Sequence, residues 1–254
     1  MIVTPIKTRS FIPPQDDVFA VFDAIDLDLQ ECSVIAVTAK IVAIHQGRCI
    51  PIPPDEKKAA LQKDELIKTE ADKYLERDLS VPFPRMFTMY EGTFCSSCGI
   101  DESNSNGYWT LLPKDSSVFA SELRLRLRDR YNIKSLGVIV VDSRSFPMRN
   151  GTIGMTIGYT GFKAQYDYRG ESDLFDRPFK AERINVADCL ASTAILAMGE
   201  GAESTPVAII SDVSHIEFVD HDDSKDFMLS LKVPMEKDVF AQFYTNKNWK
   251  KEEG

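Results

Sequence analysis

The sequence predicts an α+β fold, an atypical α/β arrangement in which mixed sheets are covered by helices. Continuous apolar runs rich in β-branched residues predict buried strands over 33–38 and 136–141. Apolar residues at helical spacing predict helices over 118–131 and 186–198. Strands and helices alternate irregularly along the chain, which is typical of α+β proteins and of atypical α/β proteins.

The other elements follow from shorter patterns. In chain order they are a strand within 1–12, a helix over 16–25, a short helix over 39–44, a solvated helix or helix pair over 55–78, strands over 86–95 and 108–112, and a last core strand over 206–211. Four glycines between 151 and 161 predict either a close-packed strand with bulges or a backbone that approaches a ligand.

Composition limits the possible functions. The chain has 254 residues, of which 43% are hydrophobic, and this is enough for a substantial core. Its net charge of −9 argues against a nucleic-acid-binding protein, and no apolar run is long enough to span a membrane. We predict a main domain over 1–215, with two interlocked subdomains as an alternative, and a C-terminal extension over 216–254 that packs only in part.

The five cysteines are scattered, which favours a reducing, cytoplasmic setting. Cys95 and Cys98 have the spacing of one half of a zinc site, but the sequence has no second ligand pair at a suitable distance. We therefore predict structural cysteines, with Cys189 in the core on the apolar helix.

Three acidic residues follow apolar segments in three separate parts of the chain. They are Asp101, Asp142 and Glu200. Strand and helix ends are rigid positions from which such side chains can be aimed at one point. Hard divalent cations such as Mg²⁺ take oxygen ligands, usually one or two carboxylates together with substrate phosphates. The pattern therefore indicates an enzyme that holds metal ions against a phosphate.

The ordered motifs around these acids are more specific than any one of them. They are Gly-Ile-Asp-Glu-Ser-Asn at 99–104, Leu-Leu-Pro at 111–113, Val-Val-Asp-Ser at 140–143, Gly-Tyr-Thr-Gly-Phe-Lys-Ala at 158–164 and Met-Gly-Glu-Gly at 198–201. With them the chain resembles the coenzyme F-420 γ-glutamyl ligase family over residues 1–215, and it is most similar to the bacterial branch labelled as folate-metabolism γ-glutamate ligases.

This resemblance implies an intertwined homodimer that joins L-glutamate to a carboxylate of a deazaflavin or folate-like cofactor through an acyl phosphate. It also implies two Mg²⁺ or Mn²⁺ sites, GTP or ATP as co-substrate, and K⁺ as a further candidate ion. The implied metal ligands are Asp101, Asp142, Ser143 and Glu200, the acids among them being the catalytic residues. The implied nucleotide-binding residues are Ser10, Phe11 and Ile12, in the segment from Arg9 to Ile12, together with Lys40, Asn104, Gly199 and Gly201.

The chain departs from the family pattern at one phosphate-binding position. Archaeal members have a lysine where this chain has Ile44, and Lys40, one helical turn earlier, is expected to replace it in part. This departure leaves the nucleotide open and favours a folate or other pterin carboxylate as acceptor over the deazaflavin coenzyme. It also leaves open a non-catalytic nucleotide-binding protein of the same fold, or a metal-dependent phosphohydrolase. The basic residues expected to bind anionic substrate are Arg144, Arg149, Lys163 and Arg169, and Glu102 is a candidate base.

Overall fold

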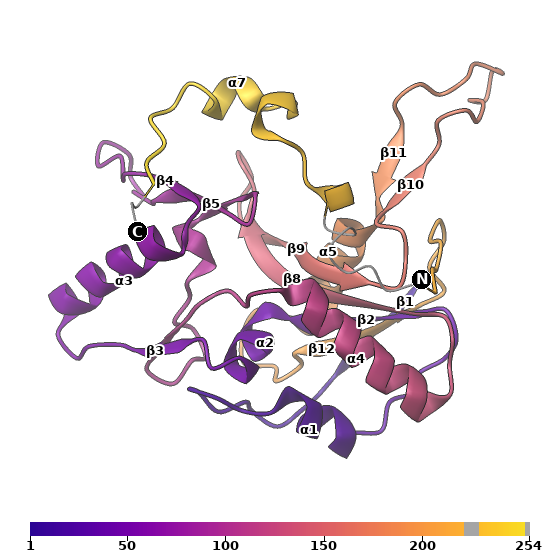
Figure 1. The fold of residues 1–254 in the computed structure, drawn as a ribbon, viewed down its shortest axis with the longest axis horizontal. Coiled ribbons are helices and arrows are strands. Elements are labelled where there is room, and N and C mark those ends of the chain that lie inside the picture. The colour runs from indigo at the N-terminus through magenta and orange to yellow at the C-terminus, as the bar shows by residue number, and fades with distance from the viewer. Residues whose placement is uncertain (221–228, 252–254) are drawn as a thin grey trace.

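A mixed five-stranded sheet forms the centre of the computed structural model, which describes residues 1–220 and 229–251 (Figure 1). The strands lie in the order β1-β12-β2-β8-β9. Their bounds are Ile2–Ile6 (β1), Val207–Ser211 (β12), Ser33–Thr38 (β2), Leu136–Ser145 (β8) and Thr152–Thr160 (β9). Strands β2 and β8 are parallel, and the other neighbours are antiparallel. The predicted α+β fold with mixed sheets is confirmed.

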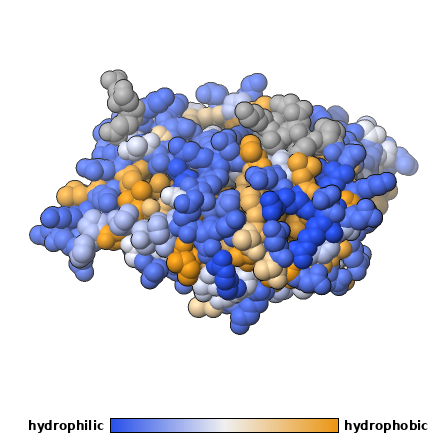
Figure 2. Space-filling model, turned by 60° about the horizontal axis from the view of Figure 1, so that its bottom comes forward, coloured by the Kyte–Doolittle hydropathy of each residue, from blue (hydrophilic) through white to orange (hydrophobic). Residues whose placement is uncertain are grey.

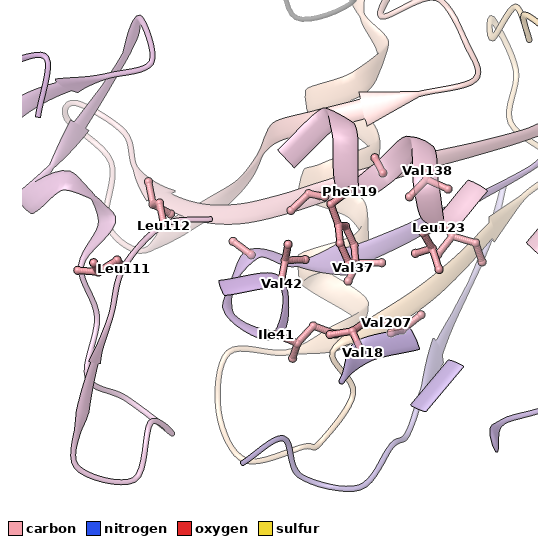
Figure 3. Packing of buried hydrophobic residues seen from close by; sticks show 14 of the residues in the cluster. Val18, Val37, Ile41, Val42, Leu111, Leu112, Phe119, Leu123, Val138 and Val207 are labelled. Carbon is pink, nitrogen blue, oxygen red and sulfur yellow. The ribbon is translucent and has the colours of Figure 1, made fainter. Parts of the chain in front are cut away.

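Helices cover both faces of this sheet, because side chains of each inner strand alternate between two apolar cores. On β2, Ile35 and Val37 contribute to one core, and Val34 and Ala36 to the other. The first core receives α1 (Val18–Ala24), α2 (Ala39–His45) and α4 (Ser116–Tyr131), and the second receives α5 (Val186–Met198). Figure 3 shows part of the first core. Double coverage explains why these strands are apolar at nearly every position.

Smaller sheets flank the central one. Strand β3 (Cys49–Pro51) pairs with β7 (Tyr108–Thr110), while β4 (Lys73–Leu75), β5 (Phe87–Tyr90) and β6 (Thr93–Ser96) form a three-stranded sheet. Strands β10 (Gln165–Asp167) and β11 (Arg183–Asn185) form an arm that projects from the molecule in Figure 1. There are also two short 3₁₀ helices. The first, η1 (Ser97–Gly99), follows β6 directly, and the second, η2 (Met235–Lys237), lies in the C-terminal extension.

Three predicted elements differ from the structure. The strand predicted over 136–141 continues to Ser145, so Asp142 and Ser143 lie within β8 and not after it. The helix predicted over 55–78 is α3 (Glu56–Glu70), which ends before β4 begins. The single strand predicted over 86–95 is the hairpin of β5 and β6, which turns at Glu91 and Gly92, both with positive φ. For α3 and for this hairpin, pairing within the small three-stranded sheet, a tertiary interaction, decides where the element ends.

Gly154, Gly158 and Gly161 serve close packing, whereas a Cβ atom on Gly151 would meet nothing within 4 Å. A Cβ atom on Gly154 would lie 2.3 Å from the carbonyl oxygen of Ala191 in α5, and one on Gly158 would lie 2.5 Å from Ser116 in α4. The register of β9 against β8 shifts between Val140 and Val141, which marks the predicted bulge. The glycines therefore let two helices approach β9 from opposite faces.

The C-terminal extension returns across the molecule. Ser230 lies 2.9 Å from the hydroxyl oxygen of Tyr159, and Lys250 exchanges two backbone hydrogen bonds of 2.9 Å with Tyr74 in β4. A short helix, α7 (Ala241–Tyr244), lies between these contacts (Figure 1). Residues 221–228 and 252–254 of the predicted extension lie outside the described residues.

The face drawn in Figure 2 carries mainly hydrophilic side chains, with hydrophobic residues in separate patches. No helix in the described ranges is long and apolar enough to cross a membrane. All five cysteines are free; Cys49, Cys95 and Cys98 are buried, which suits structural residues, whereas Cys32 is exposed. The prediction of a core position for Cys189 is wrong, because this residue is exposed on the solvent side of α5.

Candidate active site

The topology of the central sheet brings four segments to one edge. Because β2 and β8 are parallel and Thr38 pairs with Val141, the start of α2 lies beside residues 141–143. Strand β12 is antiparallel to β2, so the loop 199–206 that precedes it reaches the same edge. Residues 8–11 arrive there after β1, where the amide of Thr8 donates to the carbonyl of Ser204 over 2.9 Å. A crevice at the carboxyl ends of strands is a common ligand site in α/β sheets.

A cleft of about 570 Å³ opens between these segments and the loop after η1. Its polar and charged lining comprises Thr8, Arg9, Ser10, Thr38, Lys40, Asp101, Ser103, Asn104, Asn106, Thr110, Asp142, Ser143, Glu200, Glu203, Ser204 and Thr205. Every predicted metal ligand is in this lining, and so is every predicted nucleotide-binding residue except Ile12. The side chain of Ile12 is 57% exposed and lies outside the cleft, so its predicted role is not supported.

Asp101 is held by backbone pairing and by a lysine. Its amide and carbonyl exchange hydrogen bonds of 3.1 and 2.7 Å with Thr110. Its Oδ2 accepts from Lys40 Nζ at 2.6 Å. Burial acts to raise the pKa of Asp101, but hydrogen bonds from Lys40 and Ser103 outweigh burial and lower this pKa below its ordinary value. Asp101 is therefore a carboxylate at neutral pH.

Asp142 has an enclosed cationic partner. Its Oδ2 accepts from Arg144 Nε at 2.8 Å, and the Arg144 side chain is only 6% exposed. Burial raises the pKa of Asp142, although the charge of Arg144 acts in the opposite direction. The negative charge of Asp101 raises this pKa further, which places the two acids within range of each other's field.

Glu200 completes the acidic wall. Gly199, with a φ of 80°, ends α5 and turns the chain so that Glu200 faces β8. The Ser143 hydroxyl donates to Glu200 Oε2 at 3.1 Å. Burial raises the pKa of Glu200, and the charge of Asp142 adds to this effect. Three acids that repel one another across a cleft favour the binding of cations there.

Arg9 and Phe11 form one side of the cleft entrance. The Arg9 guanidinium binds both carboxylate oxygens of Asp16, at 2.5 and 2.8 Å, and lies 5.5 Å from the centre of the Phe11 ring. These hydrogen bonds lower the pKa of Asp16 to about 2. The contact with Arg9 holds the aromatic ring of Phe11 beside the cleft.

The other basic residues expected to bind substrate do not line the cleft. Lys163 pairs with Glu217 and Arg169 with Asp167, and Arg149 is an exposed residue after β8. Arg144 lies beneath Asp142, and the candidate base Glu102 is also absent from the lining.

The sequence analysis missed several cleft residues. Thr8, Thr38, Ser103 and Glu203 line the cleft without having been singled out. Ser103 lies inside the recognised 99–104 motif, so its position was a usable signal. Glu203 accepts a hydrogen bond of 2.8 Å from the amide of Gly201, and only the folded loop brings it there.

The donor set suits hard divalent cations that are bound together with a phosphate. The oxygens come from three carboxylates and the Ser143 hydroxyl, which face one cleft. In the part of the chain that the structure describes, no three His, Cys, Asp or Glu side chains form a group that could hold a metal ion unaided. Mg²⁺ needs no such group, because it usually keeps waters and takes one or two carboxylates plus phosphate oxygens. The residues therefore fit metal ions that share a nucleotide as ligand.

Comparison with known proteins places the chain in a family. A family model described as F420-0:gamma-glutamyl ligase matches residues 6–212, so the chain belongs to this family. The coenzyme F420:L-glutamate ligase of Methanopyrus kandleri is 33% identical over 222 residues, which cover 82% of this chain and 85% of that protein. The protein of the same name from Halorubrum lacusprofundi is also 33% identical, with coverage of 82% and 85%. That of Methanocaldococcus jannaschii is 40% identical over 47% of each chain.

Asn104 connects two walls of the cleft, and removing this connection should slow the reaction. Its Nδ2 donates to the carbonyl of Gly201 at 2.8 Å. Asn104→Gly keeps the left-handed backbone, whose φ is 52°, and removes this bond together with a side chain that lines the cleft. We expect kcat/KM for glutamate transfer to fall about fivefold to tenfold, the equivalent of about 1 kcal/mol. Asn132→Gly, at a similar φ of 51° after α4, is the control and should leave kcat/KM unchanged. Equal effects of the two variants would contradict this role.

Proposed function

We propose that this protein is a nucleotide- and divalent-metal-dependent γ-glutamyl ligase. In this proposal it joins the amine of L-glutamate to a carboxylate of a cofactor of the deazaflavin or folate type. The observation that carries the proposal is the meeting of family motifs from distant parts of the chain, 99–104, 140–143 and 198–201, in one cleft of about 570 Å³.

The reaction needs an activated acceptor, because a carboxylate oxygen is a poor leaving group. An oxygen of the acceptor carboxylate attacks the γ-phosphorus of the nucleotide, and the nucleoside diphosphate leaves with the electron pair of the broken P–O bond. The neutral amine of glutamate then attacks the acyl carbon, and inorganic phosphate leaves. Such transfers depend mainly on positioning and on stabilisation of phosphate charge.

The acidic residues would hold the metal ions. Asp101, Asp142 and Glu200, with the Ser143 hydroxyl, supply the ligands, and bound divalent ions would neutralise charge on the phosphates. Lys40 supplies a further positive charge in the cleft. Since Glu102 does not line the cleft, we assign the proton of the attacking amine to the leaving phosphate.

The acceptor and the nucleotide are proposed on separate grounds. The names of the relatives give coenzyme F420 as the substrate of those proteins, which supports a deazaflavin acceptor here. The resemblance to the bacterial branch supports a folate-like acceptor as the alternative. Ile44 is 2% exposed and lines the cleft, so an apolar side chain stands where the archaeal pattern has a lysine. We therefore propose phosphate binding through Lys40 and leave ATP and GTP as alternatives for the assay.

The test is an assay with the purified full chain. The protein is incubated with Mg²⁺ or Mn²⁺, labelled L-glutamate, ATP or GTP, and a panel of deazaflavin and folate acceptors. The proposal predicts an acceptor that gains the mass of a glutamyl residue, together with phosphate release that requires both glutamate and acceptor. Phosphate release that requires neither glutamate nor acceptor would indicate a phosphohydrolase. Nucleotide binding without any turnover would indicate a non-catalytic binding protein.

We also propose that the protein acts as a homodimer in the cytoplasm. The resemblance supports the dimer, and the five free cysteines suit a reducing compartment. Light scattering coupled to gel filtration measures the assembly directly, and a monomeric mass at micromolar concentration would contradict the dimer.

A further inference from the structure

The ammonium group of Lys40 is fully occupied by the loop that carries Asp101. Nζ lies 2.6 Å from Asp101 Oδ2 and 3.0 Å from Ser103 Oγ, and it also donates to the Ser103 carbonyl. A lysine ammonium has three N–H donors, so all of them are used. Because Lys40 lies in the first turn of α2, its ammonium group is directed at Asp101, a candidate metal ligand.

The Asp101 carboxylate is equally occupied. Its Oδ1 accepts from the amides of Glu102 and Ser103 at 2.8 and 3.1 Å. Its Oδ2 accepts from both the Ser103 hydroxyl and Lys40. A Mg²⁺ ion on this carboxylate would sit about 2.1 Å from an oxygen. The ammonium already occupies that approach, and two cations so close together repel each other.

The two cations beside the acids differ in their freedom to move. The Arg144 side chain, paired with Asp142, is 6% exposed and does not line the cleft. The Lys40 side chain is 26% exposed and does line it. Lysine also carries its charge on a flexible stem. Lys40 can therefore withdraw into the cleft, whereas Arg144 is enclosed.

We propose that Lys40 is a displaceable counter-ion of Asp101. A divalent ion takes its place on the carboxylate, and the released ammonium then binds the phosphates of the nucleotide. This inference rests on the proposed function and adds a coupling to it. When a metal ion binds alone, the hydrogen bonds of Lys40 are lost without replacement. When the nucleotide also binds, its phosphates give the ammonium group a new anionic partner. Each ligand therefore strengthens the binding of the other by the same factor.

The displacement can be measured by chemical labelling, without any assay of activity. The full chain is treated with an amine-acetylating reagent, and modification of each lysine is read by peptide mass spectrometry. We expect labelling of Lys40 to rise severalfold when Mn²⁺ is bound and to fall again when ATP or GTP is added. Lys163, which pairs with Glu217 away from the cleft, is the internal reference. Unchanged labelling of Lys40 with bound Mn²⁺ would overturn the inference.

Binding of Mn²⁺, followed by electron paramagnetic resonance, gives a second test. Lys40→Met removes the competing cation, so Mn²⁺ should bind about tenfold more tightly without nucleotide, the equivalent of about 1.4 kcal/mol. Added nucleotide should then strengthen Mn²⁺ binding less than in the wild type. Lys163→Met makes the same change in net charge outside the cleft and should leave Mn²⁺ binding unchanged.

These experiments separate the inference from the proposed function. If the wild type binds Mn²⁺ and transfers glutamate, but Lys40→Met binds Mn²⁺ no more tightly, the inference fails and the ligase proposal stands. If neither protein binds Mn²⁺, with or without ATP or GTP, both fail.

Discussion

Replacing Asp142 by asparagine should abolish glutamate transfer and also destabilise the fold. Asp142 is a proposed metal ligand, and an amide cannot replace its negative charge beside the phosphates. We expect the rate to fall by at least about a hundredfold, as when a single charge-stabilising group is removed from an active site. The same change leaves the guanidinium of Arg144, with its side chain 6% exposed, without a carboxylate. Loss of one partner of a buried ion pair costs about 3–5 kcal/mol, and the retained amide oxygen should reduce this cost.

Glu200→Gln is the matched control for this double effect. The hydrogen-bond partner of Glu200 is the neutral Ser143 hydroxyl, which an amide can still engage. We therefore expect a comparable loss of ligation with little change in the free energy of unfolding. Urea unfolding and the glutamate-transfer assay, run at a temperature where all three proteins are folded, measure the two effects separately. Full activity of Asp142→Asn would rule out metal binding by Asp142. Equal stability of the two variants would contradict a stabilising role for the ion pair between Asp142 and Arg144.

Gly154→Val should produce the other large effect, and it acts on stability alone. A Cβ atom at this position would lie 2.3 Å from the carbonyl oxygen of Ala191, a backbone atom that cannot rotate away. Overpacking of this kind costs about 1–3 kcal/mol and occasionally more, and a rigid neighbour favours the upper end. Each kcal/mol lowers the melting temperature of a chain of this size by about 2–4 °C.

The activity of Gly154→Val distinguishes packing from ligand binding. Gly154 does not line the cleft, so the rate per folded molecule should match the wild type. Thr152→Val, at an exposed position on the same strand, is the control and should change stability by no more than about 0.5 kcal/mol. A folded Gly154→Val protein that has lost nucleotide binding would instead support the alternative that the glycine-rich strand β9 binds phosphate.

The comparison of sequence and structure shows which features depend on local pattern. Strands β2 and β8 were predictable because burial on both faces makes every position apolar. Asp142 was predictable as a candidate ligand because it is the first charge after the apolar run of β8, although the strand itself continues to Ser145. The hairpin of β5 and β6 was missed because its turn uses Glu91, a residue that rarely takes a positive φ.

The structural role of Arg144 shows what local pattern leaves undecided. Asp142 and Arg144 lie two apart on β8 and so share a face. The strand was predicted to end at 141, and Arg144 was expected to bind anionic substrate rather than to pair with Asp142. Nothing in the sequence decides whether such an arginine turns to the cleft or beneath the acid, because that depends on the packing of β6 and β8. Glu203 was hidden for a similar reason, since it reaches the cleft only through the fold of its own loop.

The order of strands in the central sheet also has a consequence for synthesis of the protein. Strand β1 lies at the edge and pairs with β12, about two hundred residues later in the chain. At ribosomal speeds of about 5–20 residues per second, the first strand waits roughly 10–40 s for its partner. The cleft is therefore completed only late in synthesis, and a nascent chain that stops before residue 200 carries two of the three acids without the loop 199–206 that faces them.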